Sequence, residues 1–278
     1  MVGRVRIHNF ALSMLHLLQA NVFGNQHYDA LVSALDRLGL DRQDVAIRPH
    51  TDELVNENGE AAVIDTDHVF CWGSVKMARI GMVQGWTPGS MMNDDHDYRV
   101  YAEHYGDEML NSDCRIIRFG DNFDPPSPIF FARPCGDTKA FSGQHFLKSS
   151  WDEFVQHKLE NDTSGRLTES TAVQIASLKT IQREFRTWIV KGKVVTASQY
   201  KIGDKVVYDR CTEPQVLDYA QRMADVYQPA EAFVLDVCMV DGGMKVVEIN
   251  CINCAGFYHA DFQKLLISVE EAFGGTKA

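Results

Sequence analysis

A glycine-containing turn lies between two apolar segments near the carboxyl end of the chain. Residues 233–235 (Phe-Val-Leu) and 244–247 (Met-Lys-Val-Val) flank residues 241–243 (Asp-Gly-Gly). Apolar segments on either side of an Asp-Gly pair are typical of a β-hairpin, because glycine adopts the backbone angles that a tight turn needs. The sequence therefore predicts two adjacent antiparallel strands here, and the pairing decides which side chains face one another.

Three oxygen-bearing side chains stand on these two strands. Asp236 lies on the first strand, and Glu248 and Asn250 close the second. Residues two apart in a strand point to the same face, so Glu248 and Asn250 project together, and the hairpin can bring Asp236 across to meet them. Mg²⁺ prefers hard oxygen donors and few protein carboxylates. The pattern predicts a magnesium site. The alternative is that these acids are solvated residues at a strand edge.

The composition is that of an ordinary globular protein. A chain of 278 residues is long enough for one large domain or for two to three small lobes with cores of their own. Its net charge of −11 argues against a nucleic-acid binder that works by bulk electrostatics. No apolar run approaches the roughly twenty residues that span a bilayer. Polar residues interrupt the apolar stretch at the N-terminus, so we expect a strand leading into a helix there rather than an export signal.

The cysteines favour a reducing environment. The chain holds seven of them, an odd number, which is typical of free thiols and a cytoplasmic location. Cys251 and Cys254 form a C-x-x-C pair, for which a redox pair or half of a zinc site are the alternatives. No second C-x-x-C is present in the sequence to complete four zinc ligands. We therefore interpret the pair as two cysteines in a loop.

The first part of the chain alternates helical and extended patterns. Apolar residues recur at helical spacing over 28–40, and extended segments are predicted over 44–48 and 62–72. The second extended segment delivers Gly73-Ser74 and runs into a helical pattern over 75–84, which is the unit of an α/β sheet. Such sheets bind ligands at the carboxyl ends of their strands. Gly73-Ser74 therefore either contacts a ligand or only makes the turn.

A proline-rich segment at 121–128 marks the expected main boundary. A helix over 98–110 and a short strand over 115–119 are predicted before it. We accordingly place an α/β domain over residues 1–121 and a second domain over residues 129–278.

A strand that ends in Arg-Pro follows the boundary. Residues 129–134 (Ile-Phe-Phe-Ala-Arg-Pro) lead into a loop of small residues that contains Lys139. The planar guanidinium of Arg133 can hold two phosphate oxygens, and Lys139 would add a mobile point charge. The loop lacks the G-x-x-x-x-G-K-S/T pattern, which excludes a Walker-type P-loop. The position of both residues between a buried strand and a Ser-Gly turn favours phosphate binding over two surface charges.

Further segments lie between this loop and the metal hairpin. Ser150 and Glu153 form a capping box that predicts a helix over 151–159. A strand over 172–175 contains Gln174, and an irregular connector over 176–181 contains Lys179.

A second hairpin carries paired charges. Residues 182–190 alternate, turn at a glycine and return as residues 194–201. Glu184 and Arg186 share a face of the first strand, and Lys201 approaches from the return strand. A cross-strand salt bridge on a solvated hairpin is the alternative to a ligand site. A helix over 214–227 then leads back to the first hairpin.

The order of these segments resembles the ATP-grasp superfamily. Arg133-Pro134, Glu184-Phe-Arg186 and Gly256-Phe-Tyr258 are similar to motifs of a divergent clade of ATP-grasp domain proteins found in bacteria and phages. Arg133 stands where most members of the superfamily have a lysine. The resemblance extends over residues 129–262. It implies an α/β ATP-grasp fold with an N-terminal pre-grasp domain and two lobes, at about 129–181 and 182–278, that enclose ATP.

The resemblance also implies roles for individual residues. Asp236, Glu248 and Asn250 would ligate Mg²⁺, and the connector backbone would bind the adenine edge. Residues that would contact ATP are Arg133, Lys139, Gln174, Lys179, Glu184, Arg186 and Lys201. Arg186 and Lys201 would also act in catalysis, together with backbone N–H groups from Asn253 to Gly256 that would stabilise an oxyanion. Tyr258 and His259 would face the acceptor.

The implied activity is that of an ATP- and Mg²⁺-dependent ligase. Such an enzyme converts a carboxylate into an acyl phosphate and joins it to an amine or thiol, releasing ADP. The substrates would be a small-molecule or peptide carboxylate and an amine acceptor, with no nucleic acid and no membrane. A phosphotransferase that stops after phosphorylation, or a nucleotide-binding protein without turnover, are the alternatives. A dehydrogenase is excluded by the lack of G-x-G-x-x-G, and a serine hydrolase by the lack of G-x-S-x-G.

Overall fold

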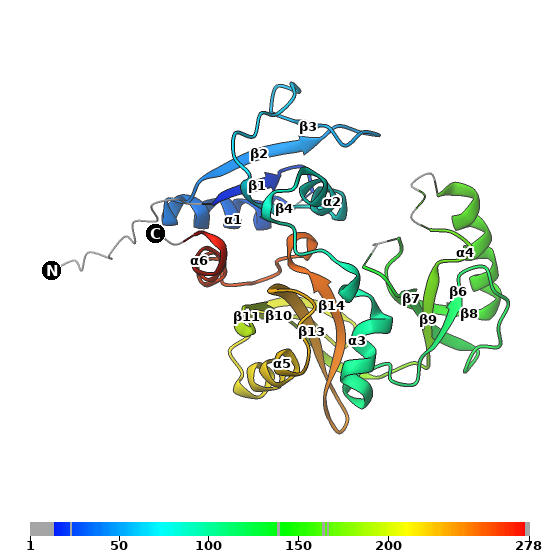
Figure 1. Cartoon of the computed structure of the whole chain (residues 1–278). Coiled ribbons are helices and arrows are strands. Elements are labelled where there is room, and N and C mark those ends of the chain that lie inside the picture. Colours follow the sequence, from blue (N-terminus) through cyan, green and yellow to red (C-terminus); the bar gives the residue numbers. More distant parts are fainter. Residues whose placement is uncertain (1–13, 23, 138–139, 163–164, 166, 276–278) are drawn as a thin grey trace.

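The helices and strands form three sheets, each covered by helices (Figure 1). The structure is a computed structural model that describes residues 14–22, 24–137, 140–162, 165 and 167–275. The mixed α/β class expected from the sequence is confirmed. The predicted N-terminal strand and helix fall largely on residues 1–13, outside the described residues. Within the described parts of the chain, no helix is long and apolar enough to cross a bilayer.

The first sheet is built from the N-terminal third of the chain in the order β3-β2-β1-β4-β5. Strands β1, β2, β4 and β5 are parallel, and β3 is antiparallel to β2. Its elements are β1 (Leu15–Gln19), α1 (Asn25–Leu38), β2 (Arg42–Ile47), β3 (Leu54–Val55), β4 (His68–Trp72), α2 (Val75–Gln84) and β5 (Thr87–Gly89). The alternation of strands and helices predicted for this region is confirmed.

Local side-chain chemistry sets the ends of these elements. Helix α1 ends at Gly39, whose φ of 66° suits a residue without Cβ. Strand β4 begins at His68, later than predicted, because the Thr66 hydroxyl accepts a hydrogen bond from the His68 N–H (3.1 Å) and forms a turn there. The helix predicted over 98–110 is shorter. Helix α3 (Tyr98–Tyr105) stops at Gly106, whose backbone (φ 51°, ψ −122°) is not helical.

The second sheet is antiparallel, in the order β6-β9-β7-β8. Its elements are β6 (Arg115–Arg118), β7 (Ile129–Pro134), β8 (Gln144–Leu147), α4 (Lys148–Asn161) and β9 (Ala172–Ala176). Helix α4 packs on it through the fully buried Trp151, which contacts a cluster of phenylalanine rings. The division of the chain into 1–121 and 129–278 stays a prediction, and the pairing of β6 with β9 places residues 115–118 beside the second part.

The capping box predicted at Ser150 is wrong. Helix α4 begins at Lys148, directly after strand β8, with Leu147 at the N-cap position. The Ser150 hydroxyl lies inside the first turn and donates to the Leu147 carbonyl (3.0 Å) instead of accepting from a backbone N–H. The strand therefore passes into the helix without a polar cap, and the Ser-Ser pair is part of the helix.

The third sheet contains both predicted hairpins, in the order β12-β11-β10-β13-β14. Its elements are β10 (Ile181–Val190), β11 (Lys193–Ile202), β12 (Lys205–Arg210), α5 (Pro214–Val226), β13 (Ala232–Val240), β14 (Gly243–Cys251) and α6 (Phe262–Phe273). Val240 pairs with Gly243, so the turn of the metal hairpin is Asp241-Gly242, and Gly242 has a φ of 97°. Strand β12 was not predicted and forms one edge.

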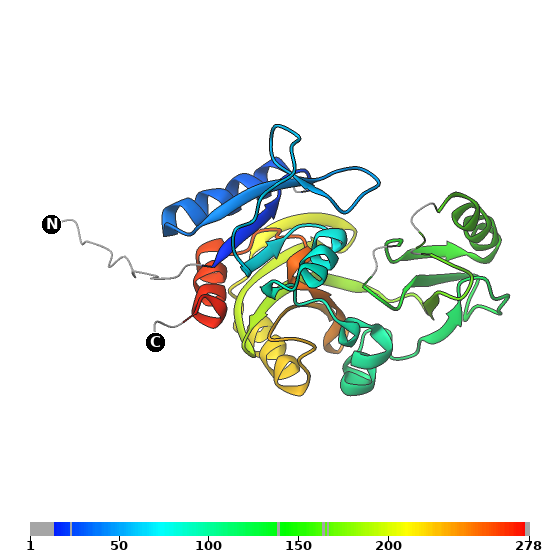
Figure 2. The same cartoon turned by 45° about the horizontal axis from the view of Figure 1, so that its top comes forward.

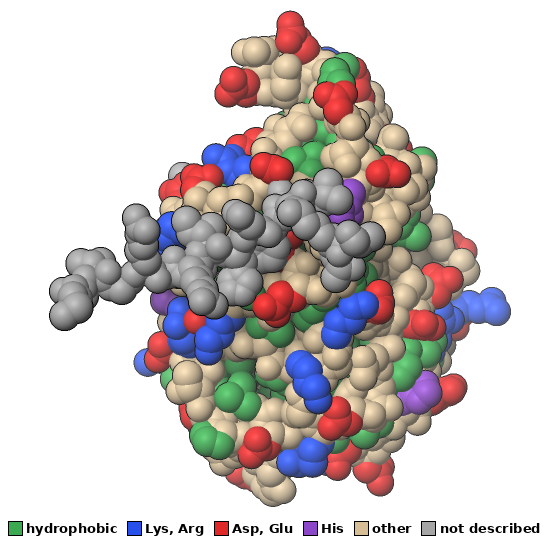
Figure 3. Space-filling model, turned by 60° about the vertical axis from the view of Figure 1, so that its left-hand side comes forward, with side chains coloured by type: hydrophobic (Ala, Val, Ile, Leu, Met, Phe, Trp, Pro, Cys, Tyr) green, Lys and Arg blue, Asp and Glu red, His purple; other side chains and the backbone are tan. Residues whose placement is uncertain are grey.

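The first and third sheets share one hydrophobic core. Trp72 of β4 packs on Phe257, with ring centroids 5.6 Å apart, and α1 lies against α6 (Figure 2). A buried hydrogen-bond chain reinforces this junction: Trp72 Nε1 donates to His16 Nδ1 (2.9 Å), and His16 Nε2 lies 2.7 Å from Glu270 Oε1. The second sheet has an aromatic core of its own. On the face shown in Figure 3, acidic and basic side chains are interspersed.

Candidate functional site

A cleft of about 580 Å³ lies between the second and third sheets. Strand β7 and the loop after it form one wall, and strands β10, β11 and β14 contribute to the other. Five of the residues proposed from the sequence line this cleft: Arg133, Lys179, Glu184, Lys201 and Glu248. They come from both lobes and from the connector between them, as the sequence order predicts.

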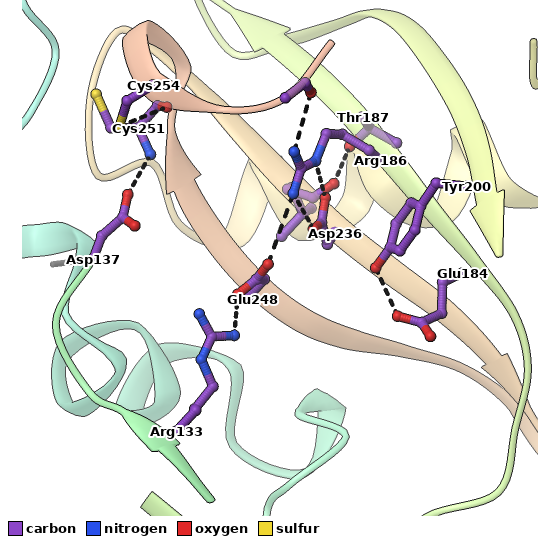
Figure 4. A network of polar contacts seen from close by, with 12 residues as sticks. Arg133, Asp137, Glu184, Arg186, Thr187, Tyr200, Asp236, Glu248, Cys251 and Cys254 are labelled. Carbon is purple, nitrogen blue, oxygen red and sulfur yellow. Dashed lines mark hydrogen bonds and ion pairs between the residues drawn. The ribbon is translucent and has the colours of Figure 1, made fainter. Parts of the chain in front are cut away.

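Three charged side chains lie in a row across the third sheet (Figure 4). Arg186 on β10 is the register partner of Asp236 on β13, which in turn pairs with Glu248 on β14. Arg186 donates to both carboxylate oxygens of Asp236, from Nε (2.8 Å) and from Nη2 (2.7 Å). Arg186 Nη2 also lies 3.8 Å from Glu248 Oε1. The two predicted metal carboxylates are therefore side by side, with an arginine against them.

The Asp236 carboxyl group has an unusual proton affinity. Burial raises the pKa of Asp236, the ion pair with Arg186 lowers it, and the neighbouring Glu248 carboxylate raises it again, so that it reaches about 7. A raised pKa in a pair of carboxyl groups means that negative charge is in excess at this point. A bound cation would relieve that excess.

The donor set fits Mg²⁺ in kind. Asn250 is fully buried and lies two residues after Glu248 on β14, so both start from the same face. A register shift between Asp236 and Val237 leaves Val247 as an extra residue beside Glu248, and such bulges reorient side chains next to active sites. No group of three or more His, Cys, Asp or Glu side chains suited to a metal occurs among the described residues. The amide oxygen of Asn250 would therefore be the third protein ligand.

Two contacts cross the cleft from the second sheet. Arg133 at the end of β7 forms an ion pair with Glu248, and both side chains are mostly buried. In the following loop, Asp137 accepts a hydrogen bond from the Cys251 N–H at the end of β14 (3.1 Å; Figure 4). Lys139, predicted to contact phosphate from the same loop, lies outside the described residues. The Arg-Pro strand therefore reaches the metal hairpin, as the resemblance implies.

Glu184 has two partners on the neighbouring strand. Lys201 Nζ lies 2.9 Å from Glu184 Oε1, and the Tyr200 hydroxyl donates to Glu184 Oε2 (2.7 Å). Adjacent residues of a regular strand point to opposite faces, but a bulge between Glu184 and Phe185 leaves Tyr200 as an extra residue. The cross-strand pair of Glu184 and Lys201 thus exists, and it lines the cleft rather than an open surface.

Lys179 and Gln174 occupy different positions. Lys179 lines the cleft, where its Nζ lies 2.8 Å from Asp113 Oδ1 and donates to Ser177 Oγ (2.7 Å). Burial raises the pKa of Asp113, and its bonds with Lys179 and Ser177 outweigh that effect and lower it. Gln174 is buried opposite Arg133 in the sheet and does not line the cleft. Its Nε2 has no hydrogen-bond partner among the described residues.

Asn253 and Gly256 do not line the cleft. The Asn253 amide joins the third sheet to the first: Nδ2 donates to the Cys71 carbonyl (2.7 Å), and Oδ1 accepts from the Met91 N–H (2.7 Å). Gly256 contacts Arg186 through its carbonyl, which accepts from Nη1 (3.1 Å). The printed contacts of both residues are therefore structural supports, and their proposed oxyanion role stays a prediction.

The remaining residues considered from the sequence have structural contacts. Ser74 caps helix α2 by accepting from the Met77 N–H (3.3 Å), and Gln19 Oε1 accepts from both the N–H (2.9 Å) and the hydroxyl of Ser74 (2.7 Å). At Gly73 a Cβ would approach the Gln19 side chain to 2.7 Å, so a side chain does not fit there. All seven cysteines, Cys251 and Cys254 included, are free thiols.

Two cleft residues were missed by the reasoning from sequence. Asp137 lies in the small-residue loop that was singled out, and an acid among small residues was the available signal. Tyr200 gave no such signal, because the bulge that turns it toward Glu184 leaves no mark in the alternation of the strand.

The fold is that of known ATP-grasp enzymes. A D-cycloserine synthetase, DcsG, superposes with a TM-score of 0.58 at 12% identity, covering 92% of this chain and 98% of that chain. The D-alanine–D-alanine ligase of Bacillus anthracis superposes with a TM-score of 0.55 at 11% identity, covering 94% and 97%. The ATP-grasp ligase PsnB, solved with a minimal precursor, superposes with a TM-score of 0.52 at 10% identity, covering 94% and 99%. The predicted fold class is confirmed.

The sequence comparison agrees with the fold. No curated protein matches the chain at a significant level. A family model for the ATP-grasp domain, described as family 3 of one clade of the superfamily, matches residues 75–269, well over half of the chain. This range contains both hairpins and the strand that ends in Arg133. The chain therefore belongs to the ATP-grasp domain proteins, in family 3 of that clade.

Proposed function

We propose that the protein is an ADP-forming ligase that activates a carboxylate with ATP and Mg²⁺ and joins it to an amine. The observation that carries the proposal is the row of Arg186, Asp236 and Glu248, which faces Arg133 from the other lobe across one cleft. The structural likeness to a synthetase and to two ligases supports a ligase within the family. We place the activity in the cytoplasm because of the free thiols.

Asp236, Glu248 and Asn250 would hold the metal. Bound there, Mg²⁺ would bridge and neutralise phosphate oxygens of the nucleotide. A carboxylate oxygen has two acceptor positions, so Asp236 can keep its hydrogen bonds from Arg186 and still offer oxygen to a cation. Glu248 can do so once Arg133 moves its guanidinium toward phosphate.

The cationic side chains of the cleft would bind the phosphates. Arg133 approaches from β7, Lys201 from β11 and Lys179 from the connector. Each now pairs with a carboxylate, so binding of a polyphosphate exchanges one anionic partner for another. Arg186 lies beside the metal ligands, where it would stabilise charge on the transferred phosphoryl group. The Gln174 amide, buried opposite Arg133 with an unused donor, supports a ligand on that wall.

The substrates are proposed as a class. A small-molecule or peptide carboxylate would receive the phosphoryl group, and an amine would attack the acyl phosphate. Tyr258 and His259, which follow the metal hairpin, stay our candidates for contacts with the acceptor.

Trapping of the acyl phosphate tests this function. The protein is incubated with ATP, Mg²⁺, hydroxylamine and a panel of amino acids and short peptides, and hydroxamate and ADP are quantified. A ligase gives hydroxamate and ADP in equal amounts with the carboxylate it accepts. ADP without hydroxamate, together with a phosphorylated hydroxyl or amine product, would identify a phosphotransferase instead.

The matched variants are Glu248→Gln, which keeps the size of a metal ligand and removes its charge, and Glu103→Gln on the exposed side of α3. We expect hydroxamate formation to fall with the first and to stay unchanged with the second. Equal rates in both variants would contradict a role for Glu248.

A further inference from the structure

Tyr258 has a strained backbone in a buried position. Among the described residues, three non-glycine residues have a positive φ: His50 (60°), Lys191 (47°) and Tyr258 (45°). His50 and Lys191 are exposed, whereas Tyr258 is a bulky aromatic residue that is only partly exposed. A left-handed backbone at such a residue is unfavourable and persists where its surroundings fix it, often at functional sites. The contacts of the Tyr258 ring should therefore explain why this conformation is kept.

Two tyrosines of the third sheet hold the ring. Tyr200 of β11 stacks on it with centroids 4.9 Å apart and planes at 25°, and Tyr208 of β12 stacks with centroids 5.1 Å apart at 17°. Tyr200 is also hydrogen-bonded to Glu184 in the cleft. The ring is thus fixed to the strands that carry the nucleotide-site residues.

The ring of Tyr258 is also the flat support of Arg186. The Arg186 guanidinium carbon lies 4.6 Å from the Tyr258 ring centroid, and the Gly256 carbonyl, two residues earlier, accepts from Arg186 Nη1 (3.1 Å). Asp236 binds the same guanidinium along its edge. A guanidinium stacks on aromatic faces and forms hydrogen bonds in its own plane. Asp236 therefore fixes one edge of Arg186, and the 256–258 loop fixes its face and its other edge.

We propose that Tyr258 is a positioning residue that holds the plane of the Arg186 guanidinium in the cleft wall. This role rests on the proposed function for its catalytic meaning. When Asp236 shares its oxygens with a metal ion, its hold on Arg186 weakens, and the Tyr258 ring and the Gly256 carbonyl keep the guanidinium in place. Glycine would adopt the left-handed backbone without strain but would bring no ring. The strain is kept because the ring is needed.

The first test follows Arg186 itself and needs no activity. Exchange of the Arg186 Nε–H with solvent is measured by ¹⁵N NMR on the full-length protein, and the signal is assigned by its loss in Arg186→Lys. The variants are Tyr258→Phe, which keeps the ring, and Tyr258→Ala and Tyr258→Gly, which remove it. Lys191→Gly is the matched control, because it removes a positive φ of the same size in an exposed turn.

We expect wild type, Tyr258→Phe and Lys191→Gly to exchange at similar rates. In Tyr258→Ala and Tyr258→Gly the exchange should be about tenfold faster, as the loss of a cation–π contact implies. Tyr258→Gly should resist denaturant at least as well as Tyr258→Ala, because glycine relieves the backbone strain. Unchanged exchange of Arg186 in folded Tyr258→Gly would overturn the proposal.

Kinetics then separate this inference from the proposed function. If the ligase activity is real, Tyr258→Gly should lower kcat by about tenfold while the KM for ATP changes little, since an interaction made mainly in the transition state is weakened. A wild-type kcat in a variant whose Arg186 has been released would overturn the positioning role. Wild-type protein without any ATP turnover would contradict the proposed function alone, and the NMR result would still decide the positioning of Arg186.

Discussion

The two arginines of the cleft are held in different ways. The Arg186 side chain is 7% exposed, and its contacts come from β13 and from the loop after β14 within the same lobe. The Arg133 side chain is 19% exposed, and its ion pair with Glu248 joins two different lobes. One wall of the cleft is therefore organised before any ligand binds, while the contact made by the other wall depends on how the lobes approach each other.

This difference assigns different duties to the two walls. A preorganised charge stabilises a transition state without rearrangement at the moment of reaction, which suits Arg186. A charge that crosses between lobes can exchange Glu248 for phosphate as a nucleotide enters, which suits Arg133. The following predictions test the contrast.

Removal of Arg186 should have the largest effect on stability. In Arg186→Met the Asp236 carboxylate stays buried without its partner, which should lower the free energy of unfolding by about 3–5 kcal/mol at neutral pH. Chemical denaturation measures the change. The double variant Arg186→Met with Asp236→Leu removes both charges and should recover most of the loss. An unchanged denaturation midpoint in the single variant would show that the pair is not buried as described.

The raised pKa of Asp236 gives the next largest effect. Between its ordinary value of 3.8 and about 7, the folded protein holds a proton at this group that the unfolded chain releases. The contribution of Asp236 to stability is therefore present at low pH and is lost as the pH rises, with a slope of up to about 1.4 kcal/mol per unit. Denaturation of wild type and of Asp236→Asn at several pH values isolates this slope. Parallel pH profiles for the two proteins would contradict it.

Removal of Arg133 should affect stability least. Arg133→Gln breaks a partly exposed pair, so we expect the free energy of unfolding to change by at most about 1 kcal/mol. Nucleotide affinity should nevertheless fall by about tenfold, because a charge-assisted phosphate contact is lost. Calorimetric titration with an ATP analogue gives the affinity, and Arg118→Gln on the exposed strand β6 is the control. A loss of stability as large as that of Arg186→Met would remove the contrast between the two arginines.

Much of the third sheet could be predicted from sequence because its signals are local. The alternation around Glu184 and Arg186 and the Asp-Gly turn at residues 241–242 fixed the strands and their hairpins, and the observed pairs follow from them. The pair of Arg186 with Asp236 could not be predicted in the same way, because it joins strands fifty residues apart whose register is set by the whole sheet.

The misses have physical causes as well. The Ser150 cap was overridden because strand β8 runs straight into α4. Tyr200 reaches Glu184 only through a bulge, which no local pattern announces. The positive φ of Tyr258 arises from ring contacts with two strands that are distant in sequence. Positions fixed by tertiary contacts are therefore the ones that sequence patterns do not show.

The central claim is that Glu248 belongs to a magnesium–nucleotide site. The most direct test is a thermal-shift titration of wild type, Glu248→Gln and Glu103→Gln with a non-hydrolysable ATP analogue, with and without Mg²⁺. A ligand at about a hundred times its dissociation constant should stabilise the native state by about 2.7 kcal/mol. We expect wild type and Glu103→Gln to show this stabilisation, and Glu248→Gln to lose the part that depends on Mg²⁺. No response of wild type to any nucleotide, or an equal response to Mg²⁺ in all three proteins, would contradict the account.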